Sequence, residues 1–217
     1  ALDCIVCIYH GTPAQPDKYQ TSIMKRLFAI CIALGFGFNA QSQGFFTWTA
    51  GEGDFYQASN WDLNRIPGLN DIVIINNDGT ATIGEDAGNR ELSGFELGEA
   101  EGSSDSGHIV MNGGTFRIGE FEGDSKIHIG EGNVLSTFVM NGGTIYYDGP
   151  DDPAIAGSRS SAGINENDWE VGEHGKGRFE MHGDAVFRAG DDLKISENSA
   201  GNSSVLIDGN ARLSVGS

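Results

Sequence analysis

The segment MNGGT occupies Met111–Thr115 and occurs again, unchanged, at Met140–Thr144. MHGD at Met181–Asp184 and IDGN at Ile207–Asn210 are diverged copies of its beginning. Each copy lies between two short stretches in which apolar and polar residues alternate. Residues 95–217 are therefore successive copies of one unit. Such a repeat indicates a solenoid, because a single unit cannot bury its apolar face without a neighbour.

The copy that shows the unit best runs from Trp169 to Gly190. Alternation occurs there in three short segments separated by turn residues, which is typical of strands with one buried face. Across the copies, the first strand is expected at Phe95–Leu97, Lys126–Ile129, Trp169–Val171 and Leu193–Ile195. The second is expected at His108–Met111, Thr137–Met140, Arg178–Met181 and Ser204–Ile207. The third is expected at Thr115–Ile118, Thr144–Tyr147, Val186–Ala189 and Arg212–Val215.

This pattern predicts an all-β fold, a right-handed parallel β-helix in the form of a three-sided solenoid of about four coils. Additional residues fall only between the strands, and a solenoid tolerates them there because loop-closure entropy grows slowly with length. Gly113, Gly142, Gly183 and Gly209 follow the second strand of each copy, so we expect corners with positive φ at these positions. A phosphate-binding loop is excluded, because neither a helix nor a lysine follows these glycines.

The residues before the repeats predict export. Lys25 and Arg26 precede an apolar run from Leu27 to Phe38, which is shorter than the roughly 20 residues that a membrane span needs. We therefore predict a signal peptide over residues 24–42, cleaved before Gln43, and an extracellular or cell-surface location. Residues 1–23 are then expected to be upstream sequence that is not native to the protein.

Cysteine content and charge exclude several classes of function. Cys4 and Cys7 precede the predicted signal peptide and Cys31 lies within it, so the exported chain would have no disulfide and no thiolate metal site. The chain has 31 acidic and 13 basic residues, a formal net charge of −18. Nucleic acid is therefore not an expected partner, since binding it requires clustered Lys and Arg. We also do not expect an integral membrane protein in this part of the chain.

Residues 43–94 differ from the repeats. They contain expected strands at Ile72–Ile75 and Thr80–Ile83, preceded by an aromatic-rich segment. We predict that this segment caps the first coil, where open strand edges would otherwise invite aggregation. The alternative is that Trp48 and Trp61 form an aromatic platform that binds carbohydrate.

A family resemblance rests on Trp48, Ser59-Asn60-Trp61, Ile66-Pro67 and Asp71–Ile74, followed by the repeated Gly-Gly-Thr words. Together these segments resemble the secreted bacterial β-solenoid proteins, which include autotransporter-type adhesin passengers and large surface proteins with autotransporter-associated strand repeats. The resemblance covers nearly all of residues 43–217. It implies a structural or adhesive segment without catalysis. Because the last residues follow a third strand without a cap, we expect them to belong to a longer protein.

The enzymatic alternative is a β-helix lyase or hydrolase that degrades extracellular polysaccharides. Resemblance to such enzymes implies carboxylates that bind calcium on an outer face, near a basic residue. The outward columns are expected to be Glu96, His128, Glu170 and Lys194 on the first strands, Val110, Val139, Glu180 and Leu206 on the second, and Arg117, Tyr146, Arg188 and Ser214 on the third. None is a ladder of carboxylates, and we expect Glu170 and Lys194 to form a cross-strand ion pair. We therefore predict no catalytic residues.

The long insertion at residues 148–168 is the candidate metal site. Both of its ends return to one corner, so its acidic residues could converge on calcium, which takes about six to eight oxygen ligands. The candidate ligands are Asp148, Asp151, Asp152, Glu166 and Asp168. His108, His128, His174 and His182 lie on different strands or turns, so no zinc site is predicted from them. No cofactor is predicted to be required.

Partners are expected outside the cell. Val110, Val139 and Leu206 would form an outward apolar stripe, and such a stripe is usually covered. A loop of the chain, a partner or a second copy could cover it. An extracellular glycan, a cell-surface protein and self-association are therefore the interactions that we expect.

Overall fold

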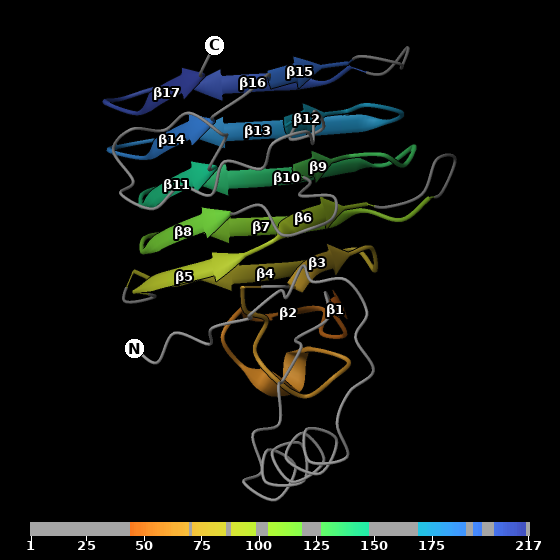
Figure 1. Cartoon of the computed structure of the whole chain (residues 1–217). Helices are drawn as coiled ribbons and strands as arrows, with labels where there is room; N and C mark the ends of the chain where they lie inside the picture. Colours follow the sequence, from red (N-terminus) through yellow and green to blue (C-terminus); the bar gives the residue numbers. More distant parts are fainter. Residues whose placement is uncertain are drawn as a thin grey trace, which may run out of the picture. The chain divides into compact units, whose positions relative to one another are not determined.

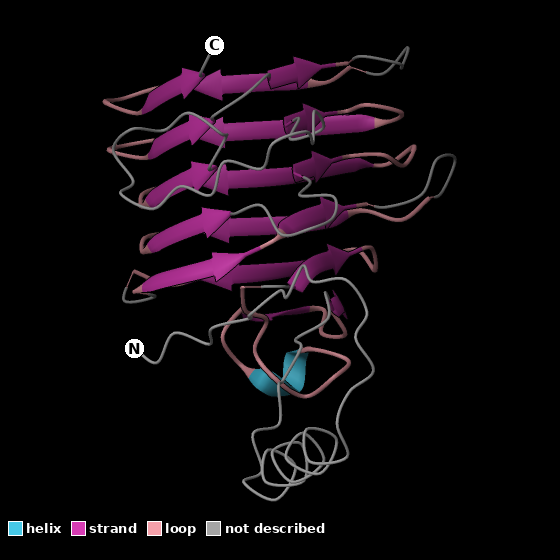
Figure 2. Cartoon of the chain, in the orientation of Figure 1, coloured by secondary structure: helices cyan, strands magenta, loops and turns pink. Residues whose placement is uncertain are grey.

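The computed structural model describes residues 44–69, 71–85, 88–98, 104–118, 127–147, 169–189, 193–196 and 202–215. Their regular structure is β throughout, apart from a 3-10 turn, η1, at Ala58–Asn60 (Figure 2). The strands form three parallel sheets, and successive coils lie one above another from β3 to β17 (Figure 1). The parallel β-helix predicted from the repeat is confirmed.

Each sheet collects the strands from one side of the successive coils. The first sheet contains β1 (Gly44–Thr47), β3 (Asp71–Ile75), β6 (Gly94–Leu97), β9 (Ile127–Ile129), β12 (Trp169–Val171) and β15 (Leu193–Ile195). The second contains β2 (Glu52–Asp54), β4 (Gly79–Ile83), β7 (Gly107–Met111), β10 (Leu135–Met140), β13 (Lys176–Met181) and β16 (Ser204–Ile207). The third contains β5 (Asn89–Leu92), β8 (Thr115–Ile118), β11 (Thr144–Tyr147), β14 (Val186–Ala189) and β17 (Arg212–Val215).

The described part of the chain has five complete coils, one more than the repeat alone predicts. Every strand expected in the repeats is present, with its ends shifted by no more than two residues. The additional coil is made by β3, β4 and β5, of which β5 has no counterpart among the predicted strands. Asn89-Arg90-Glu91 contains no apolar residue, so alternation gave no sign of this strand.

The core is a set of inward columns that run along the stack. Met111, Met140 and Met181 pair in register and are fully buried. Ile207 continues the same column, but its side chain is 42% exposed, because no described coil follows β16. Parallel strands lie about 4.8 Å apart, so each inward side chain packs directly on its equivalents in the neighbouring coils.

Aromatic rings continue this core to the β1–β2 end of the stack. Trp61 packs edge-on against both Trp48 and Phe55, with ring centroids 4.9 and 5.0 Å apart, and its Nε1 donates a hydrogen bond to the Phe55 carbonyl. Phe55 in turn contacts Phe95 and Phe116 of the coil formed by β6, β7 and β8. The aromatic-rich segment therefore closes that end of the core, as expected of a cap.

The corners after the second strands use glycine in two ways. Gly183 and Gly209 have the expected positive φ, of 60° and 66°. In the two MNGGT copies, positive φ falls one residue later than expected, on Gly114 and Gly143. The preceding glycine of each pair serves close packing instead. A Cβ on Gly113, for example, would lie 2.7 Å from a backbone atom of the coil below.

Candidate functional site

The outer face of the third sheet carries a column of polar and aromatic side chains. Pairing in register places Glu91, Arg117, Tyr146 and Arg188 on successive strands, in that order. The Arg188 guanidinium lies 5.5 Å from the centroid of the Tyr146 ring, which is within the range of a cation–π contact. Tyr146 therefore lies between two arginines, as the predicted outward column implies.

An open groove of about 720 Å³ adjoins this column. The loop that precedes β3 forms one wall, and outward side chains of β5, β8 and β11 form the other. Ser93 fixes the loop, because its hydroxyl donates to the Leu69 carbonyl at 3.1 Å. The lining residues are Pro67, Gly68, Leu69, Glu91, Thr115, Arg117 and Tyr146.

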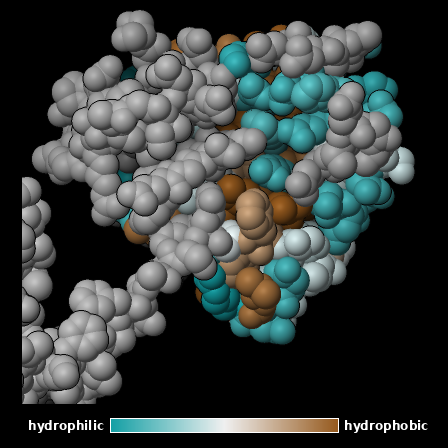
Figure 3. Space-filling view, turned by 45° about the vertical axis from the view of Figure 1, so that its right-hand side comes forward, coloured by the Kyte–Doolittle hydropathy of each residue, from teal (hydrophilic) through white to brown (hydrophobic). Residues whose placement is uncertain are grey.

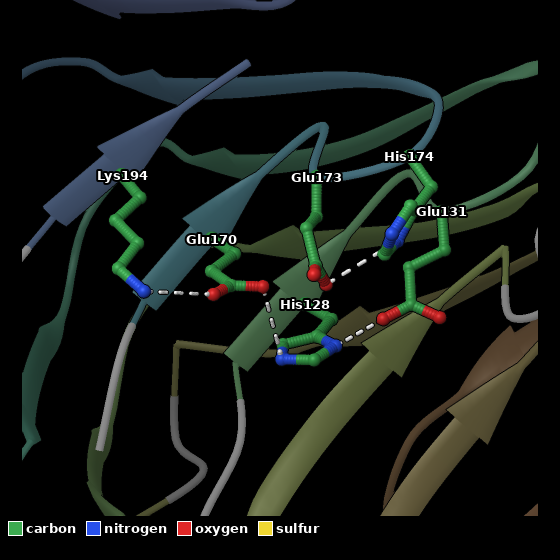
Figure 4. A network of polar contacts seen from close by, with 6 residues as sticks. All are labelled: His128, Glu131, Glu170, Glu173, His174 and Lys194. Carbon is green, nitrogen blue, oxygen red and sulfur yellow. Dashed lines mark hydrogen bonds and ion pairs between the residues drawn. The ribbon is translucent and has the colours of Figure 1, made fainter. Parts of the chain in front are cut away.

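The first sheet carries a second polar group, which we call the His128 cluster: His128, Glu131, Glu170, Glu173, His174 and Lys194 (Figure 4). The column Glu96, His128, Glu170 and Lys194 is in the predicted register. Lys194 Nζ donates to Glu170 Oε1 at 3.4 Å, so the predicted ion pair is confirmed. On its other side, Glu170 Oε2 lies 3.4 Å from Nε2 of His128. The other ring nitrogen of His128, Nδ1, contacts Oε1 of Glu131.

Glu170 is the buried member of the His128 cluster, with 7% of its surface exposed. Its Oε2 accepts no hydrogen bond from any described residue. Burial raises the pKa of the Glu170 carboxyl to about 7, and a hydrogen bond with Glu173 acts in the same direction. His128 and Lys194 oppose this rise through their charge.

Glu131 and Glu173 were not among the predicted site residues. Both follow a glycine with positive φ, Gly130 or Gly172, at the end of a first strand. The sequence nevertheless contains a signal for these two glutamates. A tripeptide of an apolar residue, glycine and glutamate recurs at Leu97-Gly98-Glu99, Ile129-Gly130-Glu131 and Val171-Gly172-Glu173. A search for ladders of carboxylates on the strands misses this tripeptide, because its glutamate lies at the corner after the strand.

The two sets of site residues predicted from the sequence have different outcomes. Trp48 and Trp61 are each only 1% exposed, so neither presents a ring face on which a sugar could stack. Their interpretation as a carbohydrate platform is corrected to a core role, because packing against each other and Phe55 removes both indoles from solvent. The candidate calcium ligands Asp148, Asp151, Asp152, Glu166 and Asp168 lie outside the described residues.

Two of the four histidines that were expected to lie apart come together. His128 and His174 belong to the His128 cluster, whereas His108 lies on β7. His182 contacts Glu180 and Asp208, at 2.9 and 2.8 Å.

The outward column of the second sheet is also in its predicted register, with Val110 beside Val139 and Glu180 beside Leu206. Both valines are half-buried, and Leu206 is 40% exposed. Figure 3 shows a face on which most exposed described residues are hydrophilic, with a smaller hydrophobic group between them. Among the described residues, no helix has the length and apolar character needed to cross a bilayer.

Comparison with known proteins found no match for this chain. No protein-family model matches the chain, and neither a curated protein nor a solved structure matches it.

Proposed function

We propose that this chain is a structural and adhesive β-solenoid segment of an exported bacterial surface or secreted protein. We further propose that it binds acidic glycans through the outer face of its third sheet. The observation that carries this proposal is the column Arg117–Tyr146–Arg188 beside the open groove. The same proposal assigns the stacked coils the role of a rigid support for that face.

The chemistry of the column suits a sugar polymer that carries carboxylates. The Tyr146 ring offers a flat apolar surface with a polar edge, on which a pyranose ring can stack. Arginine pairs with a carboxylate through two parallel hydrogen bonds, so Arg117 and Arg188 could each hold an acid group on either side of the ring. Glu91 and Thr115 supply acceptors and donors for hydroxyl groups at the groove wall.

Charge favours an acidic ligand at this face in particular. The whole chain has a net charge of −18, so the two arginines on β8 and β14, the strands that flank β11, form a local exception. At physiological ionic strength the Debye length is about 8 Å, so a ligand bound at this column is largely screened from more distant acidic residues. Binding is therefore expected to depend on the two arginines rather than on the net charge.

The test is a titration of the full chain with a soluble polyuronate and, in parallel, with a neutral polysaccharide of similar length. We expect the polyuronate alone to bind. Arg188→Ala should weaken binding by about 10-fold or more, since a hydrogen bond to a charged group contributes roughly 1.5–3 kcal/mol. Tyr146→Ala should also weaken binding, because it removes the surface on which the sugar ring stacks. Tyr146→Phe keeps the ring and should retain most of the affinity.

Arg178→Ala is the matched control, because it removes the same charge from an exposed position on the second sheet. Equal loss of binding in this variant would show that net charge, rather than the third sheet, determines affinity. Unchanged binding by Tyr146→Ala would contradict the proposed surface. Release of unsaturated or shortened sugar products from the polyuronate would instead favour the polysaccharide-degrading alternative.

A further inference from the structure

A different face of the stack carries a second site. We propose that His128, Glu131 and Glu173 bind a divalent transition metal ion, of which Zn²⁺ is the best match, with Glu170 orienting the histidine. One ligand atom from each of the three residues lies within 4.8 Å of the other two. The ion would join two successive coils, because His128 and Glu131 belong to the β9 coil and Glu173 to the β12 coil.

Repetition of the corner explains why the two glutamates meet. Gly130 and Gly172 have φ values of 83° and 76°, and the Gly172 amide donates to the Ile129 carbonyl at 2.8 Å. The residues that follow them, Glu131 and Glu173, are therefore equivalent positions in coils about 4.8 Å apart. Ligands around tetrahedral zinc lie about 3.3–3.5 Å from one another, which small side-chain rotations would achieve here.

The second ring nitrogen of His128 provides an independent observation. Nδ1 faces Glu131, whereas Nε2 lies 3.4 Å from the buried Oε2 of Glu170, an atom without a hydrogen bond from the described residues (Figure 4). A histidine that binds metal almost always donates its other N–H to a carboxylate, a carbonyl or water. With the metal on Nδ1, the proton is on Nε2, which then faces Oε2 of Glu170 as a donor.

Charge balance and ligand type favour the same ion. Three carboxyl groups, of Glu131, Glu170 and Glu173, share this partly buried region with the ammonium group of Lys194. A divalent cation offsets part of that excess negative charge, which is costly when removed from water. One imidazole with carboxylates suits zinc and related transition metals, whereas calcium and magnesium prefer oxygen ligands alone.

The experiment is calorimetric titration of the full chain, with its thiols alkylated, by Zn²⁺, Mn²⁺ and Ca²⁺. Zn²⁺ is expected to bind most tightly, and Glu173→Gln and Glu131→Gln should each weaken it by more than about 10-fold. At a free Zn²⁺ concentration 100 times the Kd, the Tm should rise by about 5–10 °C and return with a chelator. Glu170→Gln removes the negative charge of the acceptor but no ligand, so it should weaken binding while leaving one bound ion.

Glu180→Gln is the matched control, since Glu180 also contacts a histidine, His182, on another face. Its Zn²⁺ affinity should equal that of the unmodified sequence. Circular dichroism of each variant shows whether it is folded, so that loss of Zn²⁺ binding is distinguished from loss of the fold. Absence of Zn²⁺ binding, equal affinity for Ca²⁺, or unchanged binding by Glu173→Gln would each overturn the proposal.

Discussion

His182 occupies a corner position at which two other coils have asparagine. Asn112 and Asn141 form a short ladder, in which Asn141 Nδ2 donates to Asn112 Oδ1 at 2.9 Å. His182 continues this ladder, but its ring nitrogens contact the carboxylates of Asp208 and Glu180. These two hydrogen bonds, that of Asp208 first, raise the pKa of His182 above its ordinary value. One residue of the ladder therefore makes stability depend on pH.

The direction of this dependence follows from the raised pKa. A histidine with a raised folded-state pKa stabilises the fold fully below its unfolded pKa of about 6.5, and that contribution is lost as the pH rises through the folded pKa. We expect the Tm advantage of the unmodified chain over His182→Asn to be larger at pH 6 than at pH 9. Thermal melts of both chains at the two pH values would measure it.

His108 provides a contrast of opposite sign. Burial lowers its pKa, against the attraction of Asp78, so the folded chain favours the neutral ring. Stability from this residue is present above the unfolded pKa and decreases as the pH falls. The Tm advantage of the unmodified chain over His108→Asn should therefore be larger at pH 9 than at pH 5. Identical pH profiles for the two variants would contradict both assignments.

At the scale of the element, the corner after each second strand depends on glycine. Gly143 has φ of 85°, and a Cβ there would lie 2.8 Å from the Gly114 carbonyl oxygen of the neighbouring coil. Both the backbone conformation and the close approach therefore exclude a side chain. The geometry of the corner therefore explains why the second Gly of the MNGGT segment is repeated.

Gly143→Ala should consequently destabilise the chain by at least about 1–2 kcal/mol, the usual cost of a left-handed conformation for a residue with a Cβ. Gly84→Ala is the control, because a Cβ on Gly84 meets no atom of the described residues within 4 Å. That change should alter stability by less than about 0.5 kcal/mol. Urea unfolding of the two variants provides the comparison, and equal midpoints would show that the corner does not need glycine.

Elements also show what could be predicted from sequence and what could not. Alternation within Phe179–Met181 or Phe187–Ala189 identifies a strand and its inward face, because burial on one side imposes the period. The same logic predicted which residues form the outward columns. It failed for Asn89–Leu92, whose pairing with β8 determines its conformation although most of its residues are polar. Alternation did not decide between a cap and a platform for Trp48 and Trp61, since an aromatic residue in a sequence can be either and only packing distinguishes the two roles.

The described part of the molecule is a one-dimensional array in which each strand pairs only with strands of the coils next to it. Interior coils are covered on both sides, and Met140 and Phe138 are fully buried. Among the described residues, the β15–β17 coil has a neighbouring coil on one side only. Its inward side chains are therefore partly exposed: Ile195, Ile207 and Val215 are 46, 42 and 44% exposed. Stability should therefore vary along the stack rather than be uniform.

Amide hydrogen exchange would measure this variation in the 217-residue chain. Local opening is easiest where few buried apolar contacts hold an element. We expect the amides of β15, β16 and β17 to exchange faster than those of β9, β10 and β11 under native conditions. Uniform protection across the five coils would show that the stack opens only as a unit.

Hydrogen bonds between the strands run along the axis of the stack, from one coil to the next, as in the pairing of β7 with β10 and of β10 with β13. When a tether pulls on one end of such an array, the outermost turn can peel away while all the others keep their partners. The work of extension is then divided into several modest steps, and the remaining turns still hold the load. A filament anchored at one end would in this way yield gradually under tension instead of rupturing at once, and turns that detach would rewind when the force is released.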